Sequence, residues 1–513
     1  MTARVKIKKL LIANRGEIAV RVIRACREQG IATVAVFSEA DREALHVQLA
    51  DEAYPIGPAP ALESYLVIER LLDAARTAGA DAVHPGYGFL SENASFAEAC
   101  AGAGLTFVGP PPAAIRAMGS KTAARRIARD LGVPMVPGTL DPVASDQAAR
   151  ATARDIGYPV MLKAAMGGGG KGMRLVQREE DLAEALRSAR AEAAAAFGDA
   201  AVYLERAVVE PRHIEIQVLA DAGGRVIHLG ERECSIQRRH QKLVEECPSS
   251  FVDADLRHRM GDAACRVARA AGYVNAGTVE FLVDAERNFY FLEMNTRLQV
   301  EHPVTEMVTG IDLVAEQLRI AAGAPLSCRQ ADVTWRGWAI ECRINAEDPF
   351  AGWLPSPGRI TGLRAPSGPW VRDDSGVYEG YTIPRFYDTL LSKLIVWGAD
   401  RAAACDRMAR ALSEYRVVGV RTTIPVLERI IAHADFRAGR LSTAFLERML
   451  PHVHSNAGRY RDVAVLAAVL AEYERARRAT TATAQGQDGH HSGRADWNAG
   501  AWRRAGAGSW TGR

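Results

Sequence analysis

The chain has 513 residues, of which 48% are hydrophobic and 24% are charged, an ordinary composition for a globular protein with room for about three domains. Its formal net charge of +3 provides no strong field that would favour a nucleic acid or a membrane surface as a partner. No segment approaches the roughly 18 consecutive apolar residues that a membrane span needs.

The cysteines and the N-terminus indicate a reducing compartment. The eight cysteines are scattered and form no Cys-x-x-Cys pair, which argues against a zinc site and a disulfide framework. The basic N-terminal residues run directly into an apolar strand, without the apolar core and cleavage site of a secretory signal. We therefore expect a cytoplasmic protein.

Strand and helix signals alternate in the first part of the chain, residues 1–115. Apolar runs predict strands at 10–13, 31–37, 82–84 and 106–108. Helical stripes are predicted from Ile18 to Cys26 and at 65–78. This alternation is typical of a parallel sheet with helices on both of its faces.

The second part, 116–325, has an α+β pattern. Helices are predicted at 121–131 and 179–197, and strands at 158–164 and 201–205. Two hairpins are predicted, the first starting with the strand 213–220 and the second joining 278–284 to 289–294. Antiparallel sheets are therefore expected here.

A third part, 326–450, combines short strands with helices. The predicted strands lie at 337–345 and 393–397, and the predicted helices at 401–414 and 422–432. The extension 451–513 becomes rich in Ala, Thr, Gln, Gly and His, so we expect it to be partly disordered, with one short helix at 466–473.

A glycine tract at 167–170 follows the predicted strand that carries Lys163. Consecutive glycines allow backbone N–H groups to approach phosphate oxygens closely, and Lys163 and Lys171 add positive charge. No hydroxyl residue follows Lys171-Gly172, which excludes a Walker loop. We interpret the tract as a flap between two strands that closes over a triphosphate, with a merely flexible hairpin tip as the alternative.

The run from Phe289 to His302 places polar side chains at every second position: Glu293, Asn295, Arg297, Gln299 and Glu301. In an extended chain these side chains would lie on one face. Carboxylate and amide oxygens suit magnesium, and a guanidinium suits an oxyanion. The run therefore indicates phosphoryl chemistry on a nucleotide, with a solvated strand edge as the alternative.

A second acid and a basic cluster strengthen this interpretation. Glu280 lies on the strand expected to pair with the strand of Glu293, and two neighbouring carboxylates favour a divalent cation between them. The cluster 237–242 contains glutamines and a histidine among its cations. Such groups can bind a ribose or a small oxyanion, although a charge run is more often a solvated face.

Several long motifs together resemble biotin carboxylase, the ATP-grasp component of biotin-dependent carboxylases. They are Lys163 before the glycine tract, Arg-His-Gln-Lys at 239–242, Glu-Met-Asn-Thr-Arg-Leu-Gln-Val-Glu-His at 293–302, Glu-Cys-Arg-Ile-Asn-Ala-Glu-Asp at 341–348, and the segments 12–19 and 84–93. The resemblance covers residues 5–450. It departs from the family at Met166, where glycine is common, and at Arg206, where lysine is common.

The resemblance implies an α/β and α+β fold. The N-terminal domain (1–115) would be a Rossmann-like parallel-sheet domain. The central domain (116–325) would be an ATP-grasp domain with a mobile glycine-rich lid at about 132–205. The C-terminal domain (326–450) would be a mixed α+β domain.

The resemblance also implies roles for matching residues. ATP binding would involve Lys121, Lys163, Gly168, Gly169, Gly170, the hinge Glu205, Arg206, Ala207 and Val208, and also His213, Gln237, His240 and Leu282. The metal ligands would be Glu280, Glu293 and Asn295. Bicarbonate would be held by Lys242, Arg297, Gln299 and the Val300 backbone, with Glu301 as its general base. Arg343 would bind the biotin ureido oxygen, so that the catalytic residues would be Lys242, Arg297, Glu301 and Arg343.

The implied reaction is the first half-reaction of an acyl-CoA carboxylase, in which ATP and bicarbonate carboxylate biotin by way of carboxyphosphate. Mg²⁺ or Mn²⁺ would be the cofactor. Because no Ala-Met-Lys-Met biotinylation sequence occurs, biotin would come on a separate biotin carboxyl carrier protein. A carboxyltransferase, which would determine the final acceptor, and a second copy of the chain would be the other partners.

Two other functions are compatible with parts of the pattern. Another ATP-grasp ligase, forming carbamoyl phosphate or carboxylating a purine, would share the acid–acid–Asn pattern but not Arg343 in its motif. A non-catalytic assembly protein would not need every catalytic position filled as it is here.

Overall fold

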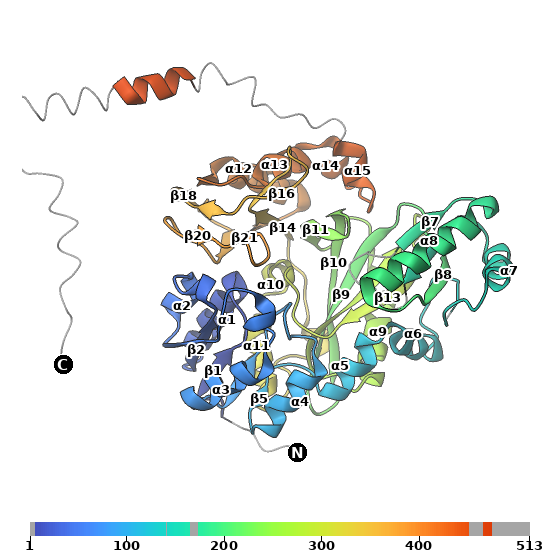
Figure 1. Ribbon diagram of the computed structural model, residues 1–513, viewed down its shortest axis with the longest axis horizontal. Helices are drawn as coiled ribbons and strands as arrows, with labels where there is room; N and C mark the ends of the chain where they lie inside the picture. The colour runs from blue at the N-terminus through green and yellow to red at the C-terminus, as the bar shows by residue number, and fades with distance from the viewer. Residues whose placement is uncertain (1–5, 140, 165–172, 451–464, 474–513) are drawn as a thin grey trace, which may run out of the picture. The chain divides into compact units, whose positions relative to one another are not determined.

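The computed structural model describes residues 6–139, 141–164, 173–450 and 465–473 (Figure 1). The chain divides into two compact units, 1–453 and 454–513. In the second unit the described residues, 465–473, form one exposed helix, which confirms the helix predicted at 466–473. The remainder of the predicted extension lies outside the described residues.

The first part of the chain forms a five-stranded parallel sheet with the order β3-β2-β1-β4-β5. Its strands are β1 (Lys9–Ile12), β2 (Ala32–Phe37), β3 (Glu52–Pro55), β4 (Ala82–His84) and β5 (Thr106–Phe107). The connecting helices include α1 (Gly16–Glu28), α2 (Leu45–Leu49), α3 (Ile68–Ala78) and α4 (Ala94–Gly102). The predicted parallel domain is confirmed, but β3 was missed because this short edge strand has no fully buried residue to create an apolar pattern.

The centre of the molecule is an eight-stranded sheet with the order β13-β12-β9-β10-β11-β14-β21-β19. Its strands are β9 (Arg212–Ala220), β10 (Val226–Arg238), β11 (Gln241–Cys247), β12 (Asn275–Val283), β13 (Phe289–Asn295), β14 (Trp338–Asn345), β19 (Val371–Ser375) and β21 (Leu390–Gly398). Both predicted hairpins are present as antiparallel pairs. Because β14 pairs with β11, strands from the third part of the chain extend the same sheet.

The predicted lid region contains a smaller sheet with the order β7-β6-β8. Its elements are β6 (Val160–Ala164), β7 (Met173–Val176), β8 (Val202–Arg206), α7 (Asp146–Ile156) and α8 (Glu179–Phe197). Lys163 pairs with Met173 in antiparallel register, so the strand expected to return after the glycine tract is confirmed. Gly168, Gly169 and Gly170 lie outside the described residues.

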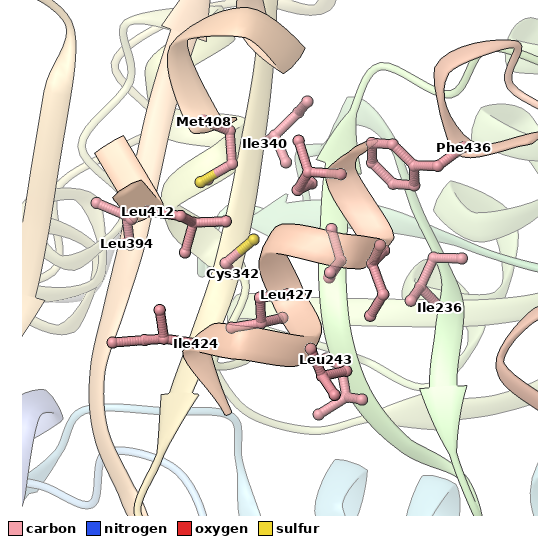
Figure 2. Packing of buried hydrophobic residues seen from close by; sticks show 14 of the residues in the cluster. Ile236, Leu243, Ile340, Cys342, Leu394, Met408, Leu412, Ile424, Leu427 and Phe436 are labelled. Atoms are coloured by element: carbon pink, nitrogen blue, oxygen red, sulfur yellow. The ribbon is translucent and has the colours of Figure 1, made fainter. Parts of the chain in front are cut away.

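The C-terminal helices α12 (Arg401–Glu414) and α13 (Ile424–Ala432) pack on the central sheet. Figure 2 shows Leu412 and Leu427 from these helices beside Cys342 and Leu394 from the strands. All four residues are at most 2% exposed. This core supports β14, the strand that carries Arg343, a residue of the candidate site.

Candidate functional site

Two acids face each other across the β12–β13 ladder, where Glu280 is the register partner of Glu293. The side-chain amide of Asn295, at the end of β13, donates to Glu280 Oε1 at 2.8 Å. Burial and the charge of Glu280 raise the pKa of Glu293, while the charge of Lys121 lowers it. Two carboxylates and an amide oxygen form a donor set that fits Mg²⁺ or Mn²⁺.

The prediction that Glu293 to Glu301 form one extended strand with a shared polar face is wrong. Strand β13 ends at Asn295, a bent segment follows, and α10 (His302–Thr309) begins directly after Glu301. The bend nevertheless returns the polar side chains to the site. Gln299 Nε2 donates to Glu280 Oε1 at 2.8 Å, and Arg297 Nη2 donates to Asn295 Oδ1 at 3.0 Å.

Lys242 is positioned by the tight turn between β10 and β11. Arg239 and His240 take positive φ angles of 47° and 68°, which closes a two-residue turn and sets Gln237 opposite Lys242. The Lys242 ammonium donates to three carboxylates: Glu215 at 2.6 Å, Glu280 at 3.1 Å and Glu301 at 2.6 Å. Burial acts to lower the pKa of Lys242, but these charges raise it well above its usual value.

Glu301 lies between two cations. Lys242 binds one of its oxygens, and Arg343 Nη2 donates to the other at 2.8 Å. Arg343 Nε also donates to Glu245 Oε1 at 2.6 Å, so the guanidinium connects two buried acids. Although burial opposes it, the positive charges of Lys242, Arg343 and Arg232 hold the pKa of Glu301 below its usual range.

Arg232, on β10, is a further cation of the site and is completely buried. Its guanidinium donates to five side chains: Glu215, Gln217, Thr278, Gln299 and Thr305. It therefore fixes both Glu215, a partner of Lys242, and Gln299 in the bent segment. Neither Arg232 nor Glu215 was predicted from the sequence, because in sequence they are isolated charges on strands.

Replacing Arg232 with methionine is expected to lower the free energy of unfolding by about 3–5 kcal/mol, because Glu215 would keep only Lys242 as its cation and the buried side chains bound by Arg232 would lose their donor. Thermal and denaturant unfolding of the full chain measure this effect. Arg329→Met is the matched control, since Arg329 pairs with Asp332 at the surface with 78% of its side chain exposed. Equal stability of the two variants would contradict a structural role for Arg232.

Several of the residues predicted to bind ATP lie on the two sheets that border this site, whereas Lys121 begins the helix α6 (Lys121–Asp130). Lys163 on β6 and Arg125 on α6 both form ion pairs with Glu205 on β8. His213 Nε2 lies 2.9 Å from Glu280 Oε2, and Leu282 is the register partner of His213. His213, which is predicted to bind ATP, is therefore in direct contact with the acid pair.

The predicted hinge 205–208 is already held by backbone hydrogen bonds. The N–H of Arg206 donates to the Pro137 carbonyl at 2.8 Å, and the N–H of Ala207 donates to the Pro159 carbonyl at 2.8 Å. Gln237 is buried on β10, whereas His240 is exposed at the turn. Val208 is half-buried and lies two residues after the end of β8.

Arg343 also lines a cavity of about 520 Å³. The N-terminal domain contributes Arg15 and Tyr87 to its lining, and the site contributes Arg297, Val300 and Arg343. Residues 386–388 and Leu390 add lining from the C-terminal part of the chain. The cavity therefore brings two of the predicted bicarbonate residues, Arg297 and Val300, to one space with the predicted biotin residue Arg343.

Two further residues support the bent segment from outside the predicted set. Lys393, fully buried on β21, donates to the Val300 carbonyl at 2.9 Å. Glu92 accepts a hydrogen bond from Arg297 Nε at 3.0 Å. Glu92 lies in the matched motif 84–93, which was the available sequence signal, whereas the role of Lys393 depends on a contact distant in sequence.

Three family models match the chain in order: the biotin carboxylase N-terminal domain at 6–115, the carbamoyl-phosphate synthase L chain ATP-binding domain at 120–329, and the biotin carboxylase C-terminal domain at 341–448. A biotin carboxylase from Nostoc sp. is 56% identical over 444 residues, which are 86% of this chain and 99% of that protein. Biotin carboxylase 1 from Bacillus subtilis is 55% identical over 442 residues, 86% of this chain and 98% of that protein.

A crystal structure of the biotin carboxylase domain dimer of 2-oxoglutarate carboxylase from Hydrogenobacter thermophilus, in complex with MgADP, ADP and bicarbonate, has the same fold. It is 49% identical, with a TM-score of 0.83 over 88% of this chain and 99% of that chain. The order of the three matched domains and the extent of these similarities lead to one assignment. The chain belongs to the biotin carboxylase family.

Proposed function

We propose that this chain carboxylates biotin with ATP and bicarbonate by way of carboxyphosphate, and that the residues described above perform the steps. The observation that carries this proposal is the placement of Glu301 within hydrogen-bonding distance of both Lys242 and Arg343, beside the acid pair on β12 and β13. The proposed base thus lies between two cations, and one of these, Arg343, lines the cavity.

The acid pair serves the nucleotide. Glu280, Glu293 and Asn295 would hold Mg²⁺ or Mn²⁺, which supplies positive charge that neutralises the ATP phosphates. Lys121 and Lys163 add fixed positive charge from α6 and β6. The lid region 132–205 carries Lys163 and Glu205, and its closure would exclude water from the reacting phosphoryl group.

Bicarbonate would bind through Lys242, Arg297, Gln299 and the Val300 backbone. Glu301 removes the bicarbonate proton, and a bicarbonate oxygen attacks the γ-phosphorus as the bond to ADP breaks. Proton transfer becomes favourable because the bound anion competes with Glu301 for the charge of Lys242. The product, carboxyphosphate, then separates into carbon dioxide and phosphate.

Biotin would enter the cavity with its ureido oxygen at Arg343. The guanidinium stabilises negative charge on that oxygen as the phosphate removes the proton from the biotin nitrogen. The nitrogen then forms its bond to carbon dioxide. Glu245 keeps Arg343 oriented through the hydrogen bond at 2.6 Å.

The domain organisation and the partners are proposed from the similarity of this chain to biotin carboxylases. We propose domains at 1–115, 116–325 and 326–450, and we propose that the chain forms a homodimer. Its partners would be a biotin carboxyl carrier protein and a carboxyltransferase.

Similar proteins include a propionyl-CoA carboxylase alpha chain, 51% identical, and the biotin carboxylase component of a pyruvate carboxylase, 50% identical. An acyl-CoA is the acceptor that we propose. The helices of the described residues include none with the length and hydropathy of a membrane span. From the scattered cysteines, which indicate a reducing compartment, we propose a cytoplasmic location.

The competing reaction is synthesis of carbamoyl phosphate, because the central family model is named for that enzyme. Both reactions begin with bicarbonate and ATP, so the second substrate separates them. The purified chain is expected to release ADP from MgATP in the presence of bicarbonate, and free biotin should stimulate this release. Stimulation by ammonia but not by biotin would contradict the proposal.

Replacing Glu293 with glutamine is expected to raise the Mg²⁺ concentration for half-maximal ATP cleavage about tenfold or more, because the charge of the ligands sets cation affinity. Titration of ATP cleavage with Mg²⁺ measures this. Glu286→Gln is the control, since Glu286 lies exposed in the turn between the same two strands. An unchanged Mg²⁺ requirement in the Glu293 variant would remove it from the metal site.

A further inference from the structure

The cavity beside Arg343 has an identifiable opening. Phe386 and Asp388 line the cavity but are themselves exposed, so they must lie where it meets solvent. Ala61 lines it from the N-terminal domain. The opening is therefore bordered by two segments far apart in sequence, 57–63 and 384–388.

Tyr387 joins these two segments. Its hydroxyl donates to the Ala59 carbonyl and also lies within hydrogen-bonding distance of Ser38 Oγ. Its ring packs edge-on against Tyr65, with the centroids 5.5 Å apart. The border of the opening is thus tied together by contacts on both sides.

The backbone of the segment 57–63 is restricted by a glycine and two prolines. Gly57 has a φ of +119°, and a Cβ atom at this position would lie 2.8 Å from the Glu63 carbonyl oxygen, so the tight path requires glycine. Pro58 and Pro60 restrict the backbone further. A surface that is already ordered loses little conformational entropy when a partner binds.

This border exposes apolar surface and a cation. Leu62, directly after the lining residue Ala61, is 79% exposed, and Phe386 is 42% exposed. The Arg385 guanidinium lies 5.3 Å from the centroid of the Phe386 ring. No carboxylate of the described residues forms an ion pair with Arg385. Aromatic rings and arginines are enriched in protein interfaces, and Leu62 adds exposed apolar area beside them.

We propose that Leu62, Arg385 and Phe386 form the docking surface for the protein that carries biotin. This inference rests on the proposed function: if biotin reaches Arg343 while attached to another protein, that protein must lie against the opening through which biotin enters. The complementary surface would be apolar, with an acidic group to pair with Arg385. Free biotin needs only the cavity and would not use this surface.

Two variants outside the cavity lining test the inference, Leu62→Glu and Arg385→Glu. The substrates are free biotin and the biotinylated carrier protein, purified on avidin from the cells that make this chain. Each variant is expected to raise the KM for the carrier about tenfold or more, with kcat/KM for free biotin within about twofold of the unaltered chain. Leu354→Glu is the matched control, because Leu354 is 63% exposed and does not line the cavity.

Unchanged carrier kinetics in the double variant would overturn the inference. So would an equal loss with free biotin and with the carrier, because the two residues would then act on the cavity rather than on docking. If the unaltered chain carboxylates neither substrate, the proposed function itself fails, and that result is distinct from both of the others.

Discussion

Replacing Glu301 with glutamine should lower bicarbonate-dependent ATP cleavage by about 10²–10⁴-fold, the usual contribution of a general base. Glutamine is nearly isosteric but cannot accept the bicarbonate proton. The amide can still contact Lys242 and Arg343, whose other partners Glu215 and Glu245 stay in place. The loss should therefore appear in kcat, whereas the affinity for ATP should change little.

Steady-state ADP release and direct titration with ATP separate these two effects. Glu306→Gln is a suitable control, because Glu306 is a buried acid on the adjacent helix α10 that binds Arg21 and Arg372 rather than the residues of the site. If Glu301→Gln retains full bicarbonate-dependent activity, Glu301 is not the base.

Replacing Arg343 with alanine should separate the two halves of the reaction. Biotin carboxylation should fall by about 10²–10³-fold or more, as expected when a donor to a developing oxyanion is removed. Bicarbonate-dependent ATP cleavage without biotin should persist in part, because Lys242, Arg297 and Gln299 remain to hold bicarbonate. The ratio of carboxybiotin formed to ADP released measures the separation.

Arg343→Lys tests whether charge alone is sufficient. Lysine keeps the positive charge but cannot span Glu245 and Glu301 with a planar guanidinium, so it should restore only part of the biotin reaction. An equal loss of both activities in Arg343→Ala would mean that the residue supports the whole site and does not act on biotin specifically.

The sequence predicted the fold well where local pattern dominates. The alternation in the first 115 residues specified the parallel sheet, and turn residues between apolar runs specified the hairpin that sets Glu280 opposite Glu293. It did not reveal that β14 joins β11, because pairing between distant strands leaves no short-range pattern in the sequence. The edge strand β3 was missed for a different reason, because none of its residues is fully buried and it has no apolar pattern.

The candidate site shows both the success and the limit of sequence reasoning. The residues Gln299 and Glu301 do meet Glu280 and Lys242, but the bend after Asn295 brings them there, not the alternation of a strand. The resemblance named the members of the site, and the structure shows what holds them. Arg232 could not be identified from sequence, because its five partners come from segments far apart in the chain.

Transfer of oxygen from bicarbonate tests the central claim most directly. The chain is incubated with MgATP, biotin and bicarbonate fully labelled with oxygen-18, and the inorganic phosphate is analysed by mass spectrometry. If ATP phosphorylates bicarbonate, each phosphate released must contain one oxygen atom from the labelled bicarbonate. Phosphate that contains oxygen from water and none from bicarbonate would contradict the account.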